Sequence, residues 1–305
     1  MERRNPEELR ARLPEGFRIR AALPEDKEAV FEFCRYTWEW GDYIPRVWDA
    51  WLSNPKGRLL VATINDQPVA VAQVTLIAPE EAWLQGFRVA PDQRNQGIAT
   101  ALLQSCLQLA IELGARVARS AVLTSNISSR RIGAKLGFHQ VASFVSYRAD
   151  AAEGSPQHLS TANPQDLAVL LPFITESSMY KSSSGLYCTG WAFHKLTPEK
   201  LRNHLANKEV FTLSEIPELR ALAIVTMSPL DEGIVIGYMA GSPEAMRDLA
   251  IGLRRQSAQN TPPQIEARLP DLPSIRDTLT LAGYKPYTDE PFLIDELSLS
   301  KSPGG

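Results

Sequence analysis

The hydrophobic and polar positions of the first half follow the two-residue period of strands in some segments and the helical period of about 3.6 residues in others. Residues 17–20 (FRIR) alternate as a short, half-buried strand does. Pro24-Glu25-Asp26 then begins a helical pattern, because proline and acidic residues favour the first turn of a helix. A second helix is predicted from Pro45 to Leu52.

Strand-like and helix-like segments continue to residue 148. Three β-rich runs come first, with the turn-forming Asn65-Asp66-Gln67 between the first two, and they cover 58–64, 69–77 and 81–89. After a loop at 90–97, apolar residues recur at helical spacing from Ile98 to Leu113, and Gly114 is placed to end this helix. A strand, a helix and a last strand are predicted over 116–124, 128–136 and 141–148. The order β-α-α-β-β-β-α-β-α-β predicts the α/β class.

The second half repeats the first in order and partly in sequence. RAALPEDKEAVFEF (20–33) matches STANPQDLAVLLPF (160–173), and LGF (136–138) matches AGY (282–284). Further strands are predicted at 210–214, 219–227, 233–240 and 264–269, and helices at 243–256 and 272–281. We interpret this pattern as a diverged internal duplication.

The segment Ala149–Gln157 contains Gly154-Ser155-Pro156 and is typical of a linker. The predicted organisation is therefore a first domain over 1–150, a linker over 151–157 and a second domain over 158–305. The length of 305 residues agrees with two domains, since about 150 residues per domain is usual.

Composition and charge exclude several classes of protein. The net charge of -3 and the absence of a Lys/Arg run argue against a nucleic-acid partner. No apolar stretch reaches the ~20 residues of a membrane span, and the first residues are charged rather than signal-like, so we expect a cytoplasmic protein. The three cysteines are expected to be buried free thiols, and four histidines without close Cys/His spacing predict no metal site. The oligomeric state is not predicted.

The segment GFRVAPDQRNQGIATALLQ (86–104) places a loop between a strand and an amphipathic helix. The first N–H groups of a helix lack intrahelical partners and carry the positive end of its dipole, so anions bind there. Gly97 allows close approach of the backbone, Ala99 keeps the first turn open, and Arg94 adds a cation. The loop therefore predicts a site for a pyrophosphate group.

Arg94-x-x-Gly97-x-Ala99 resembles the Arg/Gln-x-x-Gly-x-Gly/Ala motif of the GNAT N-acetyltransferase superfamily. The preceding FRVAP and the downstream segment from Asn126 to LGF (136–138) resemble the same family, over residues 17–150. The resemblance implies tandem GNAT-like domains, each a mixed, mostly antiparallel sheet flanked by helices. It also implies acetyl-CoA, or another acyl-CoA, as co-substrate.

The resemblance assigns the cofactor to residues of the loop, of the strand before it and of the helix after strand 116–124. These residues are Phe87, Val89, Arg94, Asn95, Gln96, Gly97, Ile98, Ala99, Thr100, Asn126 and Ser129. Asn126 is equally suited to cap the helix that follows it.

The acid and base that relatives often use are replaced in this chain. The position of the family's glutamate is Gln85, which can orient a water but cannot accept a proton, and the position of its tyrosine is Gly133. Substitutes for the base are Glu80, Glu81 and Asp42, and substitutes for the acid are Tyr147 and Tyr43. Two alternatives follow: an enzyme that acts on an easily deprotonated amine, or an acyl-CoA-binding regulatory protein without turnover.

The first two helices of the family form the wall of the acceptor site. Here this region (36–51) is rich in aromatic residues, and Trp38, Trp40 and Tyr43 suit a small amphipathic amine. The region resembles histidine and related amino-acid N-acetyltransferases. A protein substrate would instead require an open acidic groove for a lysine peptide.

The second half lacks the pyrophosphate motif. Its corresponding loop is 239–244 (MAGSPE), in which Glu244 would repel a phosphate. We expect a degenerate GNAT-like domain that has lost cofactor binding. Its segment 182–201, with Tyr187, Trp191 and His194, is expected to be rich in loops and to cover or pack against the acceptor site.

Overall fold

The computed structural model describes residues 13–39, 41–155, 159–213, 218–227, 233–259 and 263–299. The chain divides by spatial contact into two compact units. Unit 1 comprises Met1–Ser120, Ser128–His139 and Glu296–Gly305, and unit 2 comprises Ala121–Ile127 and Gln140–Asp295. The borders 1–150, 151–157 and 158–305 stay predictions, and residues 156–158 lie outside the described part of the chain.

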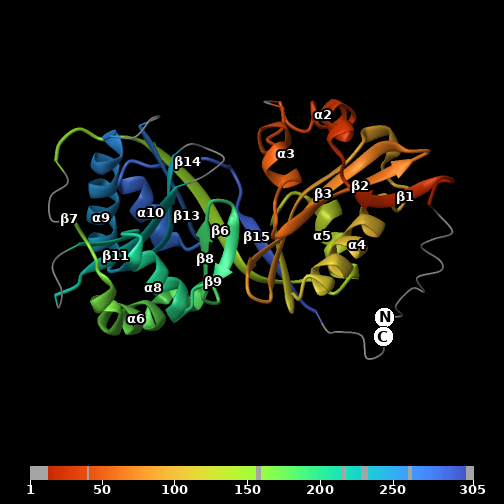
Figure 1. Ribbon diagram of the computed structural model, residues 1–305. Helices are drawn as coiled ribbons and strands as arrows, with labels where there is room; N and C mark the ends of the chain where they lie inside the picture. The colour runs from red at the N-terminus through yellow and green to blue at the C-terminus, as the bar shows by residue number, and fades with distance from the viewer. Residues whose placement is uncertain are drawn as a thin grey trace. The chain divides into compact units, whose positions relative to one another are not determined.

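Unit 1 contains a sheet in the order β1-β2-β3-β4-β5 (Figure 1). These strands are β1 (Phe17–Ala21), β2 (Gly57–Ile64), β3 (Gln67–Ala78), β4 (Glu81–Val89) and β5 (Val117–Leu123). Neighbours from β1 to β4 are antiparallel, whereas β4 and β5 pair in parallel at three residues, from Glu81↔Val117 to Trp83↔Arg119. Asn65 and Asp66 have φ of 48° and 66° and form the predicted turn between β2 and β3.

The helices of unit 1 cover both sides of this sheet (Figure 1). They are η1 (Pro24–Asp26), α2 (Lys27–Cys34), α3 (Ile44–Leu52), η2 (Pro91–Gln93), α4 (Ile98–Glu112) and α5 (Ile127–Lys135). Helix α4 packs against β2, β3 and β4 through buried residues at four-residue spacing, among them Ile98, Leu102 and Cys106. It ends as predicted, because Gly114 has a φ of 92° and Ala115 N–H donates to the carbonyl of Ala110 at 2.8 Å.

Unit 2 contains a sheet in the order β6-β13-β12-β11-β10-β7, with β14 also paired to β6. Its strands are β6 (His139–Asp150), β7 (Leu159–Thr161), β10 (Val210–Leu213), β11 (Ala221–Met227), β12 (Ile234–Gly241), β13 (Gln264–Pro270), β14 (Lys285–Pro286) and β15 (Phe292–Ser298), the last residues of β15 belonging to unit 1. Its helices are η3 (Pro164–Asp166), α6 (Leu167–Glu176), α7 (Ser178–Ser182), α8 (Pro198–Ala206), α9 (Pro243–Gln256), η4 (Ser257–Gln259) and α10 (Pro273–Leu281). The mixed, mostly antiparallel sheets with flanking helices confirm the predicted fold class.

Two local features recur in both units. Asp26 accepts the backbone N–H of Leu23 at 2.7 Å, and Asp166 accepts that of Asn163 at 2.8 Å, so both helix starts are capped alike. Each unit also has two neighbouring strands that are parallel and paired at only three positions. These are β4 and β5 in unit 1, and β12 and β13 in unit 2, with pairs from Ile234↔Ile265 to Ile236↔Ala267. These shared features support the internal duplication.

The expectation that 182–201 is rich in loops is wrong. The segment forms a hairpin, β8 (Leu186–Thr189) and β9 (Ala192–Lys195), followed by the start of α8. Gly190, at a φ of 57°, opens the two-residue loop of the hairpin, and the Thr197 side chain caps Lys200 N–H. Leu186–Cys188 are all buried, as are Phe193 and His194, so these short strands lack the alternation of buried and exposed residues that would have indicated them.

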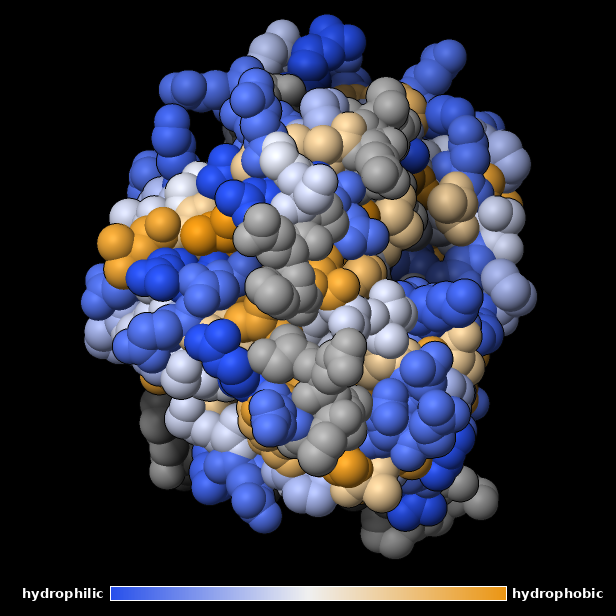
Figure 2. All heavy atoms as spheres, turned by 90° about the vertical axis from the view of Figure 1, so that its left-hand side faces the viewer, coloured by the Kyte–Doolittle hydropathy of each residue, from blue (hydrophilic) through white to orange (hydrophobic). Residues whose placement is uncertain are grey.

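None of the described helices has the length and apolar character needed to cross a membrane. Figure 2 shows one face of the molecule, on which hydrophilic residues separate the hydrophobic ones into small groups. The three cysteines are buried free thiols, as expected. Burial raises the pKa of Cys34 to about 12.

Candidate functional site

Strand β4 is interrupted by a β-bulge just before its last residues. Gln85 is paired with Gln73, but Arg88 is paired with Val71, so β4 holds one more residue than β3 over this stretch. Gly86 lies in the bulge with a φ of 70°, and a Cβ there would approach the Trp51 ring to 2.7 Å. The bulge therefore requires glycine both for its conformation and for the contact with α3.

The loop after β4 leads directly to the start of α4. It passes through η2, then through two left-handed residues, Asn95 at a φ of 64° and Gly97 at a φ of 85°. Gly97 is the N-cap of α4, and no side chain in the described part of the chain caps it. The first amide groups of this 15-residue helix thus lack the usual side-chain acceptor, which is the arrangement that binds an anion.

The other predicted loop residues surround this helix start. Arg94 is exposed, and its Nε lies 3.3 Å from the carbonyl oxygen of Val89, so its guanidinium stays near the end of β4. Gln96 Nε2 donates to Gln93 Oε1 at 3.1 Å. The Ile98 side chain is buried in the core, which leaves only its backbone for a ligand, while Ala99 and Thr100 are half-buried.

An ion pair between Arg88 and Asp42 joins the predicted acceptor region to β4, and no local sequence pattern indicates it. Arg88 Nε donates to Asp42 Oδ2 at 2.7 Å, with the Asp42 side chain fully buried. The guanidinium carbon of Arg88 lies 4.5 Å from the Trp38 ring centroid and 5.4 Å from that of Tyr43. Burial raises the pKa of Tyr43, so its hydroxyl stays protonated at neutral pH.

The aromatic residues of this region pack on one another as well as on Arg88. Trp38 and Tyr43 are stacked at 6.1 Å, and Tyr43 meets Trp51 edge-on at 5.9 Å. Trp38 and Tyr43 keep some exposure, and Trp40 lies outside the described residues. The structure brings Trp38 and Tyr43 together; their role in binding an acceptor stays a prediction.

The substitutes for a base are all held in ion pairs. Asp42 binds Arg88, Glu81 binds Arg119 at 2.5 Å, and Glu80 binds Arg116 at 2.7 Å. Gln85 is half-buried and accepts a hydrogen bond from Trp83 Nε1 at 3.1 Å.

The remaining predicted residues lie on α5, on β6 and in the turn after β5. Gly133 is buried on α5, with its missing Cβ 3.6 Å from Phe138. Ser129 lies on α5 in unit 1, whereas Asn126 and the buried Tyr147 belong to unit 2. Their roles stay predictions.

Beside Asn126 the structure reveals a carboxylate that the sequence did not point to. Glu290 accepts hydrogen bonds from the hydroxyls of Thr124 and Ser125, and from Ser125 N–H at 2.6 Å. These bonds hold the pKa of Glu290 below its usual value. No local pattern reveals them, because the partners are 165 residues apart.

Groups of three or more His, Cys, Asp or Glu side chains that would suit a metal ion are absent from the described residues.

Comparisons with known proteins agree with this geometry. Residues 27–138 match the model of the Acetyltransferase (GNAT) family. The histidine N-acetyltransferase of Oreochromis niloticus is 29% identical over 95 residues, which are 31% of this chain and 28% of that protein. This chain thus spans less than a third of the length of that curated relative.

Two solved structures share the fold over most of the chain. A GCN5-related N-acetyltransferase from Sphaerobacter thermophilus matches with a TM-score of 0.61 at 14% identity, covering 94% of this chain and 96% of that one. A tandem GNAT protein from the clavulanic acid biosynthesis pathway matches with a TM-score of 0.51 at 14% identity, covering 94% and 99%. At such identity the likeness concerns the fold alone. Residues 27–138, which include the bulged strand β4 and the uncapped start of α4, are therefore an acetyltransferase domain of the GNAT family.

Proposed function

We propose that this protein is an N-acetyltransferase that moves an acetyl group from acetyl-CoA to a primary amine of a small molecule. The start of α4 at Gly97 is the single observation that carries the proposal, because its amide groups and Arg94 suit a pyrophosphate. Phe87, Val89, Asn126 and Ser129 are the proposed partners of the pantetheine arm and the thioester. A cytoplasmic location remains our expectation.

Direct transfer makes modest demands on the protein. The amine nitrogen attacks the thioester carbonyl, the C–N bond forms, the C–S bond breaks, and the departing thiolate receives the proton that the amine loses. An α-amine has a pKa near ~8 against ~10.4 for lysine, so a free α-amine loses its proton far more easily. Positioning and stabilisation of the oxyanion by backbone N–H groups then supply the rate without a dedicated base.

The acceptor class follows from the aromatic region. Trp38 and Tyr43 offer partly exposed rings, and the guanidinium of Arg88 that lies against both rings is paired with the carboxylate of Asp42. Such a wall favours a small amphipathic amine, such as a free amino acid, over a basic peptide. The similarity to a histidine N-acetyltransferase supports histidine as the first substrate to assay.

Calorimetric titration of the full-length chain with acetyl-CoA tests binding, and a thiol-release assay with free amino acids tests turnover. Arg94→Glu combined with Gly97→Asp should abolish binding, because both changes oppose a phosphate at the helix start. Arg116→Glu, which reverses another exposed arginine of unit 1, should leave binding unchanged. Equal affinity in the double variant and in the wild type would place the cofactor elsewhere.

The second candidate function is an acyl-CoA-binding regulatory protein. The observation in its favour is that Gln85 and Gly133 replace the acid and base of relatives, while Asp42, Glu80 and Glu81 are held in ion pairs. Tight binding of acetyl-CoA without thiol release for any amine tested would favour this alternative over the enzyme.

A further inference from the structure

In unit 2 the β8–β9 hairpin packs against β12 and β13, two strands that are paired over only a short stretch. Strands β12 and β13 pair in parallel only from Ile234↔Ile265 to Ile236↔Ala267, as β4 and β5 do at three pairs in unit 1. The register of β12 with β11 shifts between Ile236 and Tyr238, which places a bulge at Gly237. Each unit thus has a bulge with a glycine beyond its parallel pairs, at Gly86 in β4 and at Gly237 in β12.

What contacts the bulge differs between the units. A Cβ on Gly86 would meet the ring of Trp51 from α3, whereas one on Gly237 would lie 1.8 Å from the backbone carbonyl oxygen of Cys188 in β8. Strand β8 packs against both β12 and β13. The backbone of the hairpin therefore lies directly on β12, at the point where β12 and β13 part. This close contact leaves no room for a Cβ, so only glycine fits at position 237.

A buried arginine of β13 also holds this hairpin. Arg268 is fully buried and donates from Nη1 to the carbonyl oxygen of Gly190 at 2.6 Å. Its guanidinium carbon lies 3.8 Å from the ring centroid of Trp191, and Nη2 donates to Glu266, a carboxylate that also accepts from Arg148. If the hairpin left, a donor of this buried guanidinium would lose its acceptor at Gly190, and leaving a buried donor unsatisfied is costly.

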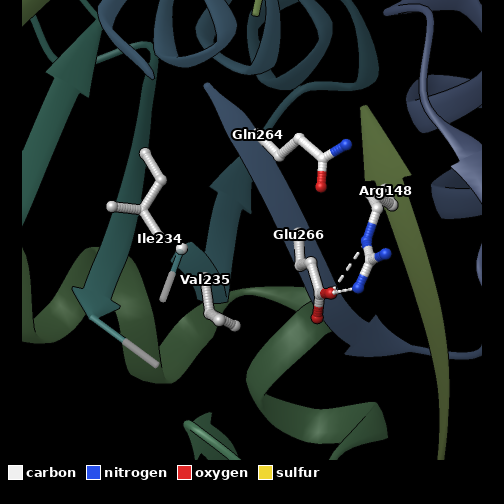
Figure 3. Close-up of a pocket in the computed structure, with 6 residues that line it drawn as sticks. Arg148, Ile234, Val235, Gln264 and Glu266 are labelled. Atoms are coloured by element: carbon white, nitrogen blue, oxygen red, sulfur yellow. Dashed lines mark hydrogen bonds and ion pairs between the residues drawn. The ribbon is translucent and has the colours of Figure 1, made fainter. Parts of the chain in front are cut away.

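A small cavity lies at the paired beginnings of β12 and β13, before the point where the two strands part. Figure 3 shows the cavity between the beginnings of β12 and β13, where Arg148 and Glu266 are joined by hydrogen bonds. Its volume of about 10 Å³ is room for no more than one water molecule.

The helix that follows β12 also differs from α4. Ser242 Oγ accepts the Ala245 N–H at 3.3 Å, Pro243 has no N–H, and Glu244 adds a negative charge to the first turn. The first N–H groups of α4 in unit 1 have no side-chain cap. At the start of α9, Ser242 accepts one such N–H, Pro243 lacks one, and the charge of Glu244 disfavours an anion.

We infer that the β8–β9 hairpin is a permanent occupant of the strand junction in unit 2, so that this unit binds no acyl-CoA and each chain takes one cofactor. The inference rests on the proposed function for the cofactor of unit 1. Unit 2 is a fold of the same kind whose own hairpin takes the place of a ligand.

Calorimetric titration of the full-length chain with CoA should give one site, and none in the variant Arg94→Glu/Gly97→Asp. Two sites in the wild type, or a site that survives in the double variant, would overturn the inference. Ser242→Gly with Glu244→Ala frees the start of α9 and should still give one site in total, because the hairpin remains; a second site would show that the hairpin does not block it.

Labelling of cysteines with iodoacetamide, followed by mass spectrometry, tests the hairpin even if CoA does not bind. Cys188 is fully buried and should stay unlabelled in the native protein, with or without saturating CoA. The buried Cys34 and Cys106 in unit 1 are internal controls for general unfolding. Rapid labelling of Cys188 while both controls stay protected would mean that the hairpin leaves the junction.

Discussion

Arg88 and Asp42 form an ion pair in which Nε and Oδ2 are 2.7 Å apart, although the residues are separated by 46 positions in the sequence. The pair fixes the segment before α3 against the end of β4, where the thioester is proposed to lie. Asp42, a candidate for the base, thus has its carboxylate fully buried beside a guanidinium.

Asp42→Asn should lower the free energy of unfolding by about 3 kcal/mol, because it leaves a largely buried guanidinium without its counter-charge. Urea unfolding measures the change. Asp49→Asn is the matched control, since Asp49 forms an exposed pair with Lys27 and its loss should cost less than about 1 kcal/mol. Equal effects of the two variants would show that the Arg88–Asp42 pair does not stabilise the fold.

Gly86→Ala should destabilise the protein more than Gly97→Ala. Both glycines have positive φ, which costs an alanine about 1 kcal/mol. Only at Gly86 would the new Cβ also collide with a ring, that of Trp51 at 2.7 Å, whereas at Gly97 the nearest atom is Leu13 Cδ2 at 3.7 Å. We expect about 3 kcal/mol for Gly86→Ala in thermal or urea unfolding. A smaller loss at Gly86 than at Gly97 would mean that Trp51 moves aside.

Asp26→Asn should cost about 2 kcal/mol, because Asp26 accepts two hydrogen bonds from the Arg20 guanidinium in addition to the Leu23 N–H. Asp166 in unit 2 accepts the equivalent backbone bond from Asn163, so Asp166→Asn should cost about 1 kcal/mol. The difference between the two variants, measured by urea unfolding, isolates the contribution of Arg20.

The effect of Asp26 should depend on pH. Burial acts to raise the pKa of Asp26, but the bonds from Arg20 and Leu23 outweigh it and hold the pKa below the ordinary 3.8. A carboxylate whose pKa is lowered by folding stabilises the protein above its unfolded pKa, and this stabilisation is lost as pH falls through the folded pKa. The gap in stability between wild type and Asp26→Asn should therefore be constant near neutrality and shrink below pH 3.8. A gap that widens at low pH would contradict the assignment.

Glu290→Ala should release the turn from Thr124 to Asn126, since one carboxylate accepts three hydrogen bonds from Thr124 and Ser125. Hydrogen–deuterium exchange of the Ser125 amide should be faster in Glu290→Ala than in the wild type. Asp289→Ala changes the neighbouring exposed carboxylate and is the control. Unchanged exchange in Glu290→Ala would show that other contacts hold this turn.

Some features followed from the sequence alone because local rules determine them. Gly97 and Asn95, Gly114 at the end of α4, and the pair Asn65-Asp66 adopt the positive φ that their residue types favour. The periodic apolar residues of α4 placed the helix, and the family motif placed the loop before it. The hairpin at Leu186–Lys195 was missed because its strands are only four residues long.

Local sequence was enough to place the elements from 17 to 148, the uncapped start of α4 and the Ser242 cap of the corresponding helix in the second half, since each depends on residues close together in the chain. The packing of distant segments settled which charges pair and which element packs against β12 and β13 in unit 2. Arg88 meets Asp42 and Arg268 meets Gly190 because separate elements pack together, and such contacts leave no periodic pattern in the sequence.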